Sequence, residues 1–213
     1  MSRLLRYQVA MSLDGFIAGP NGEYDWIVMD PAIDFAALYK EFDTAVMGRK
    51  TYELVTAQGG QGAIPGFDVV VFSRTLPAAE HPGVRILNDD PRDVVTALKA
   101  KPGRDIWLFG GGVLFRSLLD DGLVDTVEVA VMPVLLGSGI PLLPPGASTK
   151  LVLADQRTLP HSGIIALAYS VPSGVGPAPG IRYIKAAKPR AVSGTSTGKP
   201  PKAATARRKR ATE

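Results

Sequence analysis

Four apolar runs, each followed directly by polar, basic or glycine residues, constrain the fold of this chain more than any other feature. The runs are Leu4–Ala10, Thr44–Met47, Val69–Phe72 and Ile106–Phe109. The last three are unbroken rather than alternating, which is typical of strands that are buried on both faces of a parallel sheet. We therefore expect four strands of one mostly parallel sheet.

Helical patterns lie between these runs. The sets with helical spacing are Phe35, Leu38, Tyr39 and Phe42; Val94, Val95 and Leu98; and Leu114, Phe115, Leu118 and Leu119. Asp30-Pro31 and Asp90-Pro91 each predict a helix start, with aspartate as the N-cap and proline in the first helical position.

Two later segments, TVEVAVMP and IIALAYSV, alternate between apolar and polar residues and have no helix between them. They predict an antiparallel C-terminal part. The fold class is α/β, with a mostly parallel central sheet and helices on both faces.

The 213 residues divide into two parts by composition. Residues 1–172 have enough apolar residues for one core, whereas residues 173–213 contain 10 of the 24 Lys and Arg residues and one of the 20 acids. This tail is rich in Pro, Gly and Ala, so we expect it to be disordered. Its charge predicts weak, non-specific contact with nucleic acid phosphates; the alternative is a flexible extension with no binding role.

Several classes of protein are excluded or disfavoured. The chain has no cysteine, which rules out disulfides, thiol nucleophiles and zinc–thiolate sites. Its two histidines, His81 and His161, lie in separate loops, so no metal site is predicted. No apolar run is long enough to span a membrane, and the N-terminus does not resemble a signal peptide, so we expect a cytoplasmic protein.

The segments that follow the four runs indicate where a ligand binds. They are MSLDGFIAGPNGEYDW, GRKTYE, SRTL and GGGVLF. Because ligands of open α/β sheets bind at the carboxyl ends of the strands, these segments predict one site. Thr51 is the expected N-cap of a helix, and helix N-termini beside basic side chains suit phosphate groups. The alternatives are solvated surface charges and, for the three glycines, a tight packing turn.

The chain resembles the dihydrofolate-reductase-like family over residues 3 to 172. The segments that carry the resemblance are MSLDGFIAGPNGEYDW, VMGRKTYE and WLFGGGVLFRSLLDDGLVDTVEVAVMPVLLGSGIPLL. The chain is most similar to the reductase domain of the bifunctional riboflavin-biosynthesis deaminase–reductase and its stand-alone relatives. The resemblance implies a three-layer αβα sandwich, NADPH as cofactor and hydride transfer.

The resemblance also implies which residues hold NADPH. Gly48, Arg49, Lys50 and Thr51 would bind the adenosine 2′-phosphate and pyrophosphate side, and Ser73 and Arg74 the 2′-phosphate and adenine. Gly110, Gly111, Gly112, Val113 and Leu114 would pass under the pyrophosphate and nicotinamide, and Ala10 would touch the carboxamide. A cis peptide is implied at Gly110–Gly111. Val113 departs from the arginine that dihydrofolate reductases often have there, which removes one phosphate contact.

Two aspartates are candidate catalytic residues. The resemblance implies an acid on the first helix as proton donor, and Asp30 and Asp34 lie near there. Asp30 is better explained as an N-cap, whereas Asp34 lies four residues before Leu38, so we expect its carboxylate to point toward the cleft; the alternative for Asp34 is an acid that is favoured by the helix dipole. Asp14 is the second candidate and a substrate contact, or else a turn residue before Gly15. Trp26 is a candidate pocket wall, or else a structural aromatic residue.

The expected function is NADPH-dependent reduction of a small heterocycle, with 5-amino-6-(5-phosphoribosylamino)uracil as the substrate that the resemblance implies. The alternatives are dihydrofolate reduction and a non-catalytic protein that binds NADPH or nucleic acid. The resemblance also implies a homodimer, with residues 133–143 as its candidate interface.

Overall fold

A computed structural model describes residues 3–57 and 62–172. Its strands are β1 (Leu5–Ser12), β2 (Phe16–Ala18), β3 (Phe42–Gly48), β4 (Asp68–Phe72), β5 (Arg85–Leu87), β6 (Asp105–Gly110), β7 (Thr126–Met132), β8 (Ile140–Pro141), β9 (Val152–Thr158) and β10 (Ile165–Ser170). Its α-helices are α1 (Phe35–Tyr39), α2 (Arg49–Ala57), α3 (Pro91–Ala100) and α4 (Gly112–Asp120), and Ala78–Glu80 forms a short 3-10 helix. The predicted tail, residues 173–213, lies outside the described residues.

Eight strands form one sheet in the order β5-β4-β3-β6-β1-β7-β10-β9. Every neighbouring pair from β5 to β7 is parallel, and β10 pairs antiparallel with both β7 and β9. The mostly parallel sheet with an antiparallel C-terminal part is therefore confirmed. One detail differs, because β7 lies parallel to β1 and only β10 reverses the direction.

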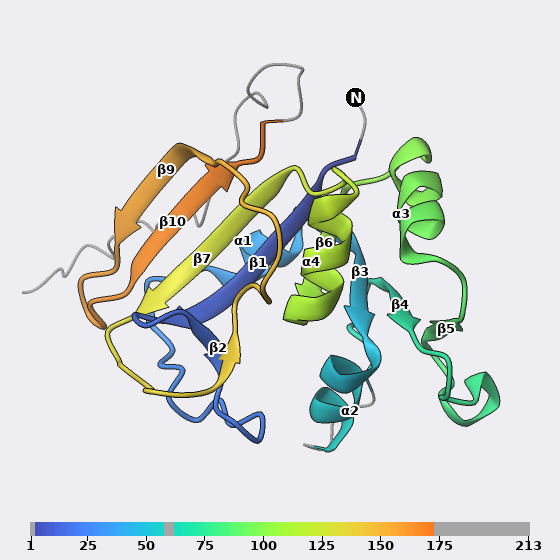
Figure 1. The fold of residues 1–213 in the computed structure, drawn as a ribbon, viewed down its shortest axis with the longest axis horizontal. Coiled ribbons are helices and arrows are strands. Elements are labelled where there is room, and N and C mark those ends of the chain that lie inside the picture. Colours follow the sequence, from blue (N-terminus) through green and yellow to red (C-terminus); the bar gives the residue numbers. More distant parts are fainter. Residues whose placement is uncertain (1–2, 58–61, 173–213) are drawn as a thin grey trace, which may run out of the picture.

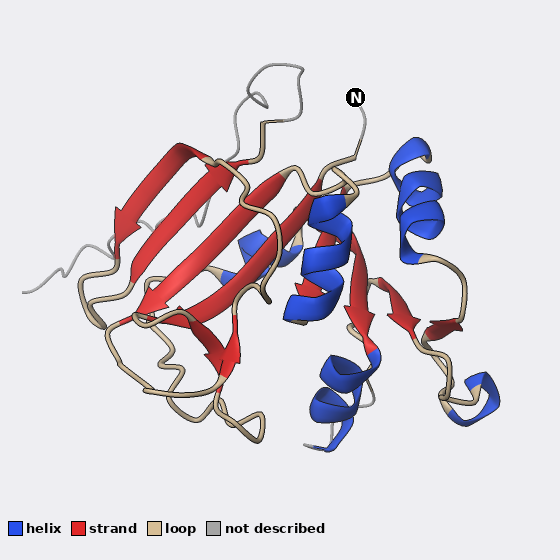
Figure 2. Ribbon diagram, in the orientation of Figure 1, coloured by secondary structure: helices blue, strands red, loops and turns tan. Residues whose placement is uncertain are grey.

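The helices cover both faces of the sheet. Side chains of α3 and α4 join Leu5, Ile106 and Leu108 in one core cluster, whereas Tyr52 of α2 packs on the opposite face with Met47. Figure 1 shows α4 in front of the sheet and α1 behind it. Figure 2 shows that no helix lies in front of β9 and β10. The three-layer αβα arrangement is confirmed.

The two Asp-Pro pairs have different outcomes. Asp90 caps α3 by accepting from the backbone N–H of Arg92, with proline in the first turn, as predicted. Asp30 begins no helix, because α1 starts only at Phe35 and ends before Phe42, which begins β3. Instead, the Asp30 carboxylate accepts hydrogen bonds from Ala32 N and from Ser162 N and Oγ. It thereby ties the turn before α1 to the β9–β10 hairpin.

Candidate functional site

The carboxyl ends of the central parallel strands meet at one edge of the sheet. Gly48, the last residue of β3, lies opposite Phe72 of β4, and Met47 lies opposite Gly110 of β6. Ser73 and Arg74 follow β4, and Arg49 and Lys50 follow β3. The residues that the resemblance assigned to the cofactor are therefore brought together.

The three consecutive glycines form the junction between β6 and α4. Gly110 has φ of +145°, a conformation that side chains rarely permit, and the Gly110–Gly111 peptide is cis, as predicted. A Cβ on Gly111 would lie 3.1 Å from Thr51 Oγ1, whereas a Cβ on Gly112 would lie 3.0 Å from the carbonyl oxygen of Pro141. Gly112 therefore serves close packing, and Gly110 and Gly111 border the first turn of α2.

Two helices begin at this edge. Helix α4 has Gly111 as its N-cap with no side-chain capping bond, and α2 begins at Arg49. The expectation that Thr51 is an N-cap is wrong, because the helix starts two residues earlier and Thr51 lies within its first turn. The first N–H groups of a helix have no partner within it, so both ends present donors suited to phosphate oxygens.

The basic residues differ in how they are held. Arg49 Nη1 donates to Glu53 Oε1 at 2.7 Å along α2, and both side chains are about half exposed. Lys50 and Arg74 are exposed. Ser73 is buried, and its Oγ accepts from the backbone N–H groups of Thr75 and Leu76. Ser73 thus shapes the turn that presents Arg74.

Val113 and Leu114 occupy the first turn of α4 in opposite ways. Val113 is 78% exposed, so its position faces solvent without the arginine found in dihydrofolate reductases. Leu114 is buried, and its side chain packs in the core under α4. Of the contacts predicted for Leu114, only those of its backbone N–H are compatible with this arrangement.

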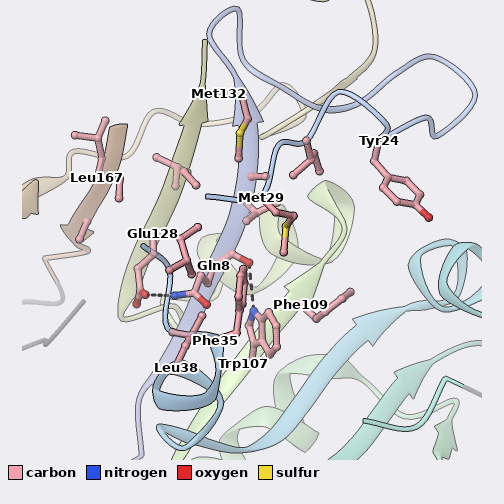
Figure 3. A pocket seen from close by; sticks show the side chains of 18 of the residues that line it. Gln8, Tyr24, Met29, Phe35, Leu38, Trp107, Phe109, Glu128, Met132 and Leu167 are labelled. Atoms are coloured by element: carbon pink, nitrogen blue, oxygen red, sulfur yellow. Dashed lines mark hydrogen bonds between the residues drawn. The ribbon is translucent and has the colours of Figure 1, made fainter. Parts of the chain in front are cut away.

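A largely apolar pocket of about 440 Å³ lies on the face of the sheet that α1 and α2 flank (Figure 3). It is lined by residues of β1, β6, β7, β9 and β10, of the segment before α1, and of α1 and α2; among them are Ala10, Tyr24, Met29, Phe35, Leu38, Thr51, Leu54, Trp107, Phe109, Met132 and Leu167. Ala10 and Thr51 are the two predicted site residues in this wall. Thr51 also borders the glycine junction, so this residue lies between the pocket and the junction.

The reasoning from sequence missed four polar or charged residues that line the pocket, which are Gln8, Glu128, Asp155 and Arg157. Gln8 of β1 and Glu128 of β7 lie opposite each other in the sheet, and Gln8 Nε2 donates to Glu128 Oε2 at 2.9 Å. Their signal in the sequence is a polar residue inside each of two otherwise apolar strand segments, YQVA and VEVA. A polar residue at an inward position of a buried strand needs a partner.

The predicted orientation of Asp34 is wrong. Asp34 is the N-cap of α1, its Oδ1 accepts from Ala37 N at 2.9 Å, and it does not line the pocket. Because the helix starts one residue after Asp34, its carboxylate turns back onto the helix end instead of lying along the stripe of Leu38. This geometry does not support Asp34 as the proton donor.

Asp14 holds two loops together. Its carboxylate accepts from Ser12 Oγ at 2.6 Å, from Gly137 N at 2.7 Å and from Leu136 N at 3.0 Å. These hydrogen bonds, that of Ser12 foremost, lower the pKa of Asp14 to about 2. An acid that is ionised at neutral pH is unsuited to proton donation, so a catalytic role as an acid is not supported. Its contact with substrate stays a prediction.

Acid is expected to open this link between the loops. Since the folded pKa of Asp14 lies below its ordinary value of 3.8, its contribution to stability is present above about pH 4 and is lost as the pH falls toward 2. The amide proton shifts of Leu136 and Gly137, followed by NMR, should titrate with a midpoint near pH 2. Asp14→Asn should abolish this titration and Asp89→Asn, at an exposed site, should not. A midpoint near 4 in the wild type would contradict the account.

Trp26 does not line the pocket, although its neighbours Tyr24, Ile27 and Val28 do. Its ring packs against the small cluster of Met132, Leu159 and Ile164, and its Nε1 donates to Glu23 O at 3.0 Å. Of the two roles considered, the structural one holds.

Residues 3–57 and 62–172 contain no group of three side chains that could hold a metal ion. His81 Nδ1 lies 3.0 Å from the Tyr52 hydroxyl oxygen. Over the same ranges, no helix is both long and apolar enough to cross a bilayer.

The fold is of the dihydrofolate-reductase-like type. The structure superposes on a putative riboflavin biosynthesis protein from Shewanella sp. PV-4 with a TM-score of 0.68, at 27% identity over 81% of this chain and 99% of that one. It matches dihydrofolate reductase from Enterococcus faecalis, complexed with NADP(H), with a TM-score of 0.58 over 80% of this chain and 96% of that one. At 19% identity, this second likeness shows the fold alone.

The chain belongs to the RibD C-terminal domain family, whose model matches residues 3–163. Among its curated relatives is the uncharacterized protein YyaP of Bacillus subtilis, which is 34% identical over 179 residues, corresponding to 78% of this chain and 94% of that protein. The resemblance inferred from the sequence is confirmed at the level of family and fold.

Proposed function

We propose that this protein is an NADPH-dependent reductase that transfers a hydride to a small heterocyclic substrate. The observation that carries the proposal is that Thr51 borders both the apolar pocket and the glycine junction, at the sheet edge where α2 and α4 begin and where Arg49, Lys50 and Arg74 follow neighbouring strands. A site of this form holds a charged, phosphate-bearing ligand at one end and a flat, uncharged ring at the other.

The residues of this chain fit NADPH. Gly110 and Gly111 carry no side chain between the β6–α4 junction and Thr51, so backbone N–H groups can approach a pyrophosphate there. Arg49, Lys50 and Arg74 would hold the 2′-phosphate that distinguishes NADPH from NADH. NADPH supplies a hydride when bound, and the pocket orients the acceptor and excludes water from it.

The family relationship supports the reaction class. The RibD C-terminal domain family and the Shewanella protein connect the chain with riboflavin biosynthesis, and the Enterococcus reductase of the same fold is complexed with NADP(H). We therefore propose 5-amino-6-(5-phosphoribosylamino)uracil as the first substrate to test. Dihydrofolate is the second, because the fold is shared with dihydrofolate reductase. Oxidation of NADPH, followed by absorbance with each compound, separates these substrates, and no turnover with either would refute both.

Gly111→Ala tests the approach to the backbone. The added Cβ would lie between the junction and Thr51, 3.1 Å from Thr51 Oγ1. We expect the Kd for NADPH to rise about 10-fold, as for the loss of one hydrogen bond to a charged group, measured by calorimetric titration. Ser117→Ala, on the exposed face of α4, serves as the control and should leave the Kd unchanged. Unchanged affinity in Gly111→Ala would leave the glycines with a packing role alone.

The homodimer stays a prediction. Leu135 and Ile140, within the candidate interface of residues 133–143, are exposed side chains. We propose that a second copy covers them, which sedimentation of the wild type and of Leu135→Asp would test.

A further inference from the structure

Two polar side chains of the apolar pocket, Gln8 and Glu128, meet across two neighbouring strands. Gln8 of β1 and Glu128 of β7 are opposite partners in the parallel register, and both line the pocket. Figure 3 shows the two side chains joined by a hydrogen bond, with Trp107 and Phe35 beside them. Neither residue lies at the cofactor edge, which is the edge of the sheet formed by the carboxyl ends of β3, β4 and β6. We therefore assign the pair to the part of the pocket that would hold a substrate.

Glu128 is fully engaged as an acceptor. Its Oε1 accepts from Arg6 Nε at 2.7 Å and from Thr126 Oγ1 at 2.7 Å, and its Oε2 accepts from Arg6 Nη2 at 3.0 Å and from Gln8 Nε2 at 2.9 Å. Arg6 and Glu128 side chains are each 3% exposed. Burial opposes the charge on Arg6, but hydrogen bonds and attraction from Glu128 and Glu41 outweigh it and raise the Arg6 pKa. Arg6 therefore stays charged, and both oxygens of the Glu128 carboxylate face donors.

The acceptor role of Glu128 fixes which way the Gln8 amide points. Both carboxylate oxygens accept hydrogen bonds, so the group of Gln8 that faces them is the NH₂ donor. The amide oxygen, Oε1, is therefore turned away from Glu128, and it receives no hydrogen bond from the described residues. The backbone carbonyl of Gln8 accepts from Trp107 Nε1 at 3.2 Å. This hydrogen bond places the indole ring beside Gln8.

We propose that Gln8 Oε1 is the acceptor that selects the substrate of this pocket, and that Glu128 is the residue that positions it. The inference rests on the proposed reductase function and names its substrate class. The ligand is a heterocycle that directs a ring N–H or an amino group at Gln8. A ring that presents an acceptor or an N-methyl group there leaves the amide oxygen of Gln8 without a hydrogen bond in an apolar wall. Because an unpaired buried acceptor costs free energy of binding, such a site discriminates strongly between ligands with and without the N–H group.

The test compares lumazine, which carries ring N–H groups, with 1,3-dimethyllumazine, which carries none. Each compound is titrated into the full-length protein saturated with NADP⁺, and the quenching of Trp107 fluorescence is followed. The wild type should bind lumazine at least about 10-fold more tightly than the dimethyl compound. Gln8→Met keeps the length of the side chain and removes the acceptor, so it should reduce this ratio to about 1 without changing the Kd for NADP⁺.

Two further variants make the result specific. Gln156→Met makes the same change on the exposed edge strand β9, outside the pocket lining, and should keep the wild-type ratio. Glu128→Gln frees the Gln8 amide to turn over and should also reduce the ratio, with the Kd for NADP⁺ retained. Where Glu128→Gln does not fold, Gln8→Met alone decides.

The outcomes separate this inference from the function on which it rests. Absence of NADP⁺ and NADPH binding by the wild type would refute the reductase proposal. Retained dinucleotide binding, with equal affinity for the two lumazines or with no binding of either, would overturn the role of Gln8 alone. A preference for lumazine that persists in Gln8→Met would assign the selection to another group and would also overturn it.

Discussion

Arg6→Met is expected to lower the free energy of unfolding by about 3–5 kcal/mol, because it leaves a buried carboxylate without its cation. The Arg6 guanidinium donates to Glu128 through two nitrogens and also lies 2.7 Å from Glu41 Oε2 and 3.2 Å from Asp105 Oδ2. Among the residues that the structure describes, Thr126 and Gln8 would remain as the partners of Glu128, whose side chain is 3% exposed. Methionine fills much of the arginine volume, so the loss reflects charge rather than a cavity.

Urea denaturation followed by circular dichroism measures this effect, and an exposed ion pair provides a matched control. Arg85 Nη1 lies 2.7 Å from Asp68 Oδ2, with side chains that are 47% and 42% exposed. Arg85→Met should change the free energy of unfolding by less than about 1 kcal/mol, as is usual for surface pairs. Similar effects of the two substitutions would contradict the account of the charged pair beneath the pocket.

The double variant Arg49→Ala/Arg74→Ala is expected to raise the Kd for NADPH about 100-fold and to change that for NADH less than about 3-fold. The difference lies in the 2′-phosphate, which two charge-assisted hydrogen bonds of about 1.5 kcal/mol each would hold. The two arginines follow different strands, β3 and β4, whose carboxyl ends are neighbours in the sheet. Removing one of them should therefore give an intermediate affinity.

A second double variant controls for the loss of surface charge. Lys101 and Arg104 are exposed residues that precede β6, at the opposite edge of the sheet, and removing both lowers the net charge by the same amount. Lys101→Ala/Arg104→Ala should leave both dinucleotide affinities within about 2-fold. Equal weakening of NADPH and NADH in Arg49→Ala/Arg74→Ala would show that the arginines do not contact the 2′-phosphate.

The cofactor edge could be predicted from sequence because each of its parts is encoded locally. Unbroken apolar runs identify buried parallel strands, and parallel strands bring their carboxyl ends to one edge whatever the details of the loops. Gly110, Gly111 and Arg49 are placed by this rule alone. Their placement could be predicted without knowledge of the order of the strands in the sheet.

The substrate pocket could be predicted only in part, because it depends on orientations that are set far away in the chain. The predicted orientation of Asp34 was wrong because α1 begins one residue after it, which makes Asp34 the N-cap. A capping carboxylate points back onto the helix end, whereas a carboxylate on the buried stripe of the helix would point toward the pocket. Trp26 was predicted to line the pocket, whereas Tyr24, two residues earlier, lines it, because a loop has no periodicity from which to predict its inner side. Gln8 and Glu128 meet only through the register of β1 and β7, which no local pattern specifies.

The most direct test of the central claim is a titration of the wild-type protein with NADPH and, separately, with NADH, following the fluorescence of Trp107 in the pocket wall. The account predicts micromolar binding of NADPH and binding of NADH that is at least about 10-fold weaker, the difference due to contacts with the 2′-phosphate. Absence of binding by both nucleotides would contradict it, and the glycine junction would then be a packing turn.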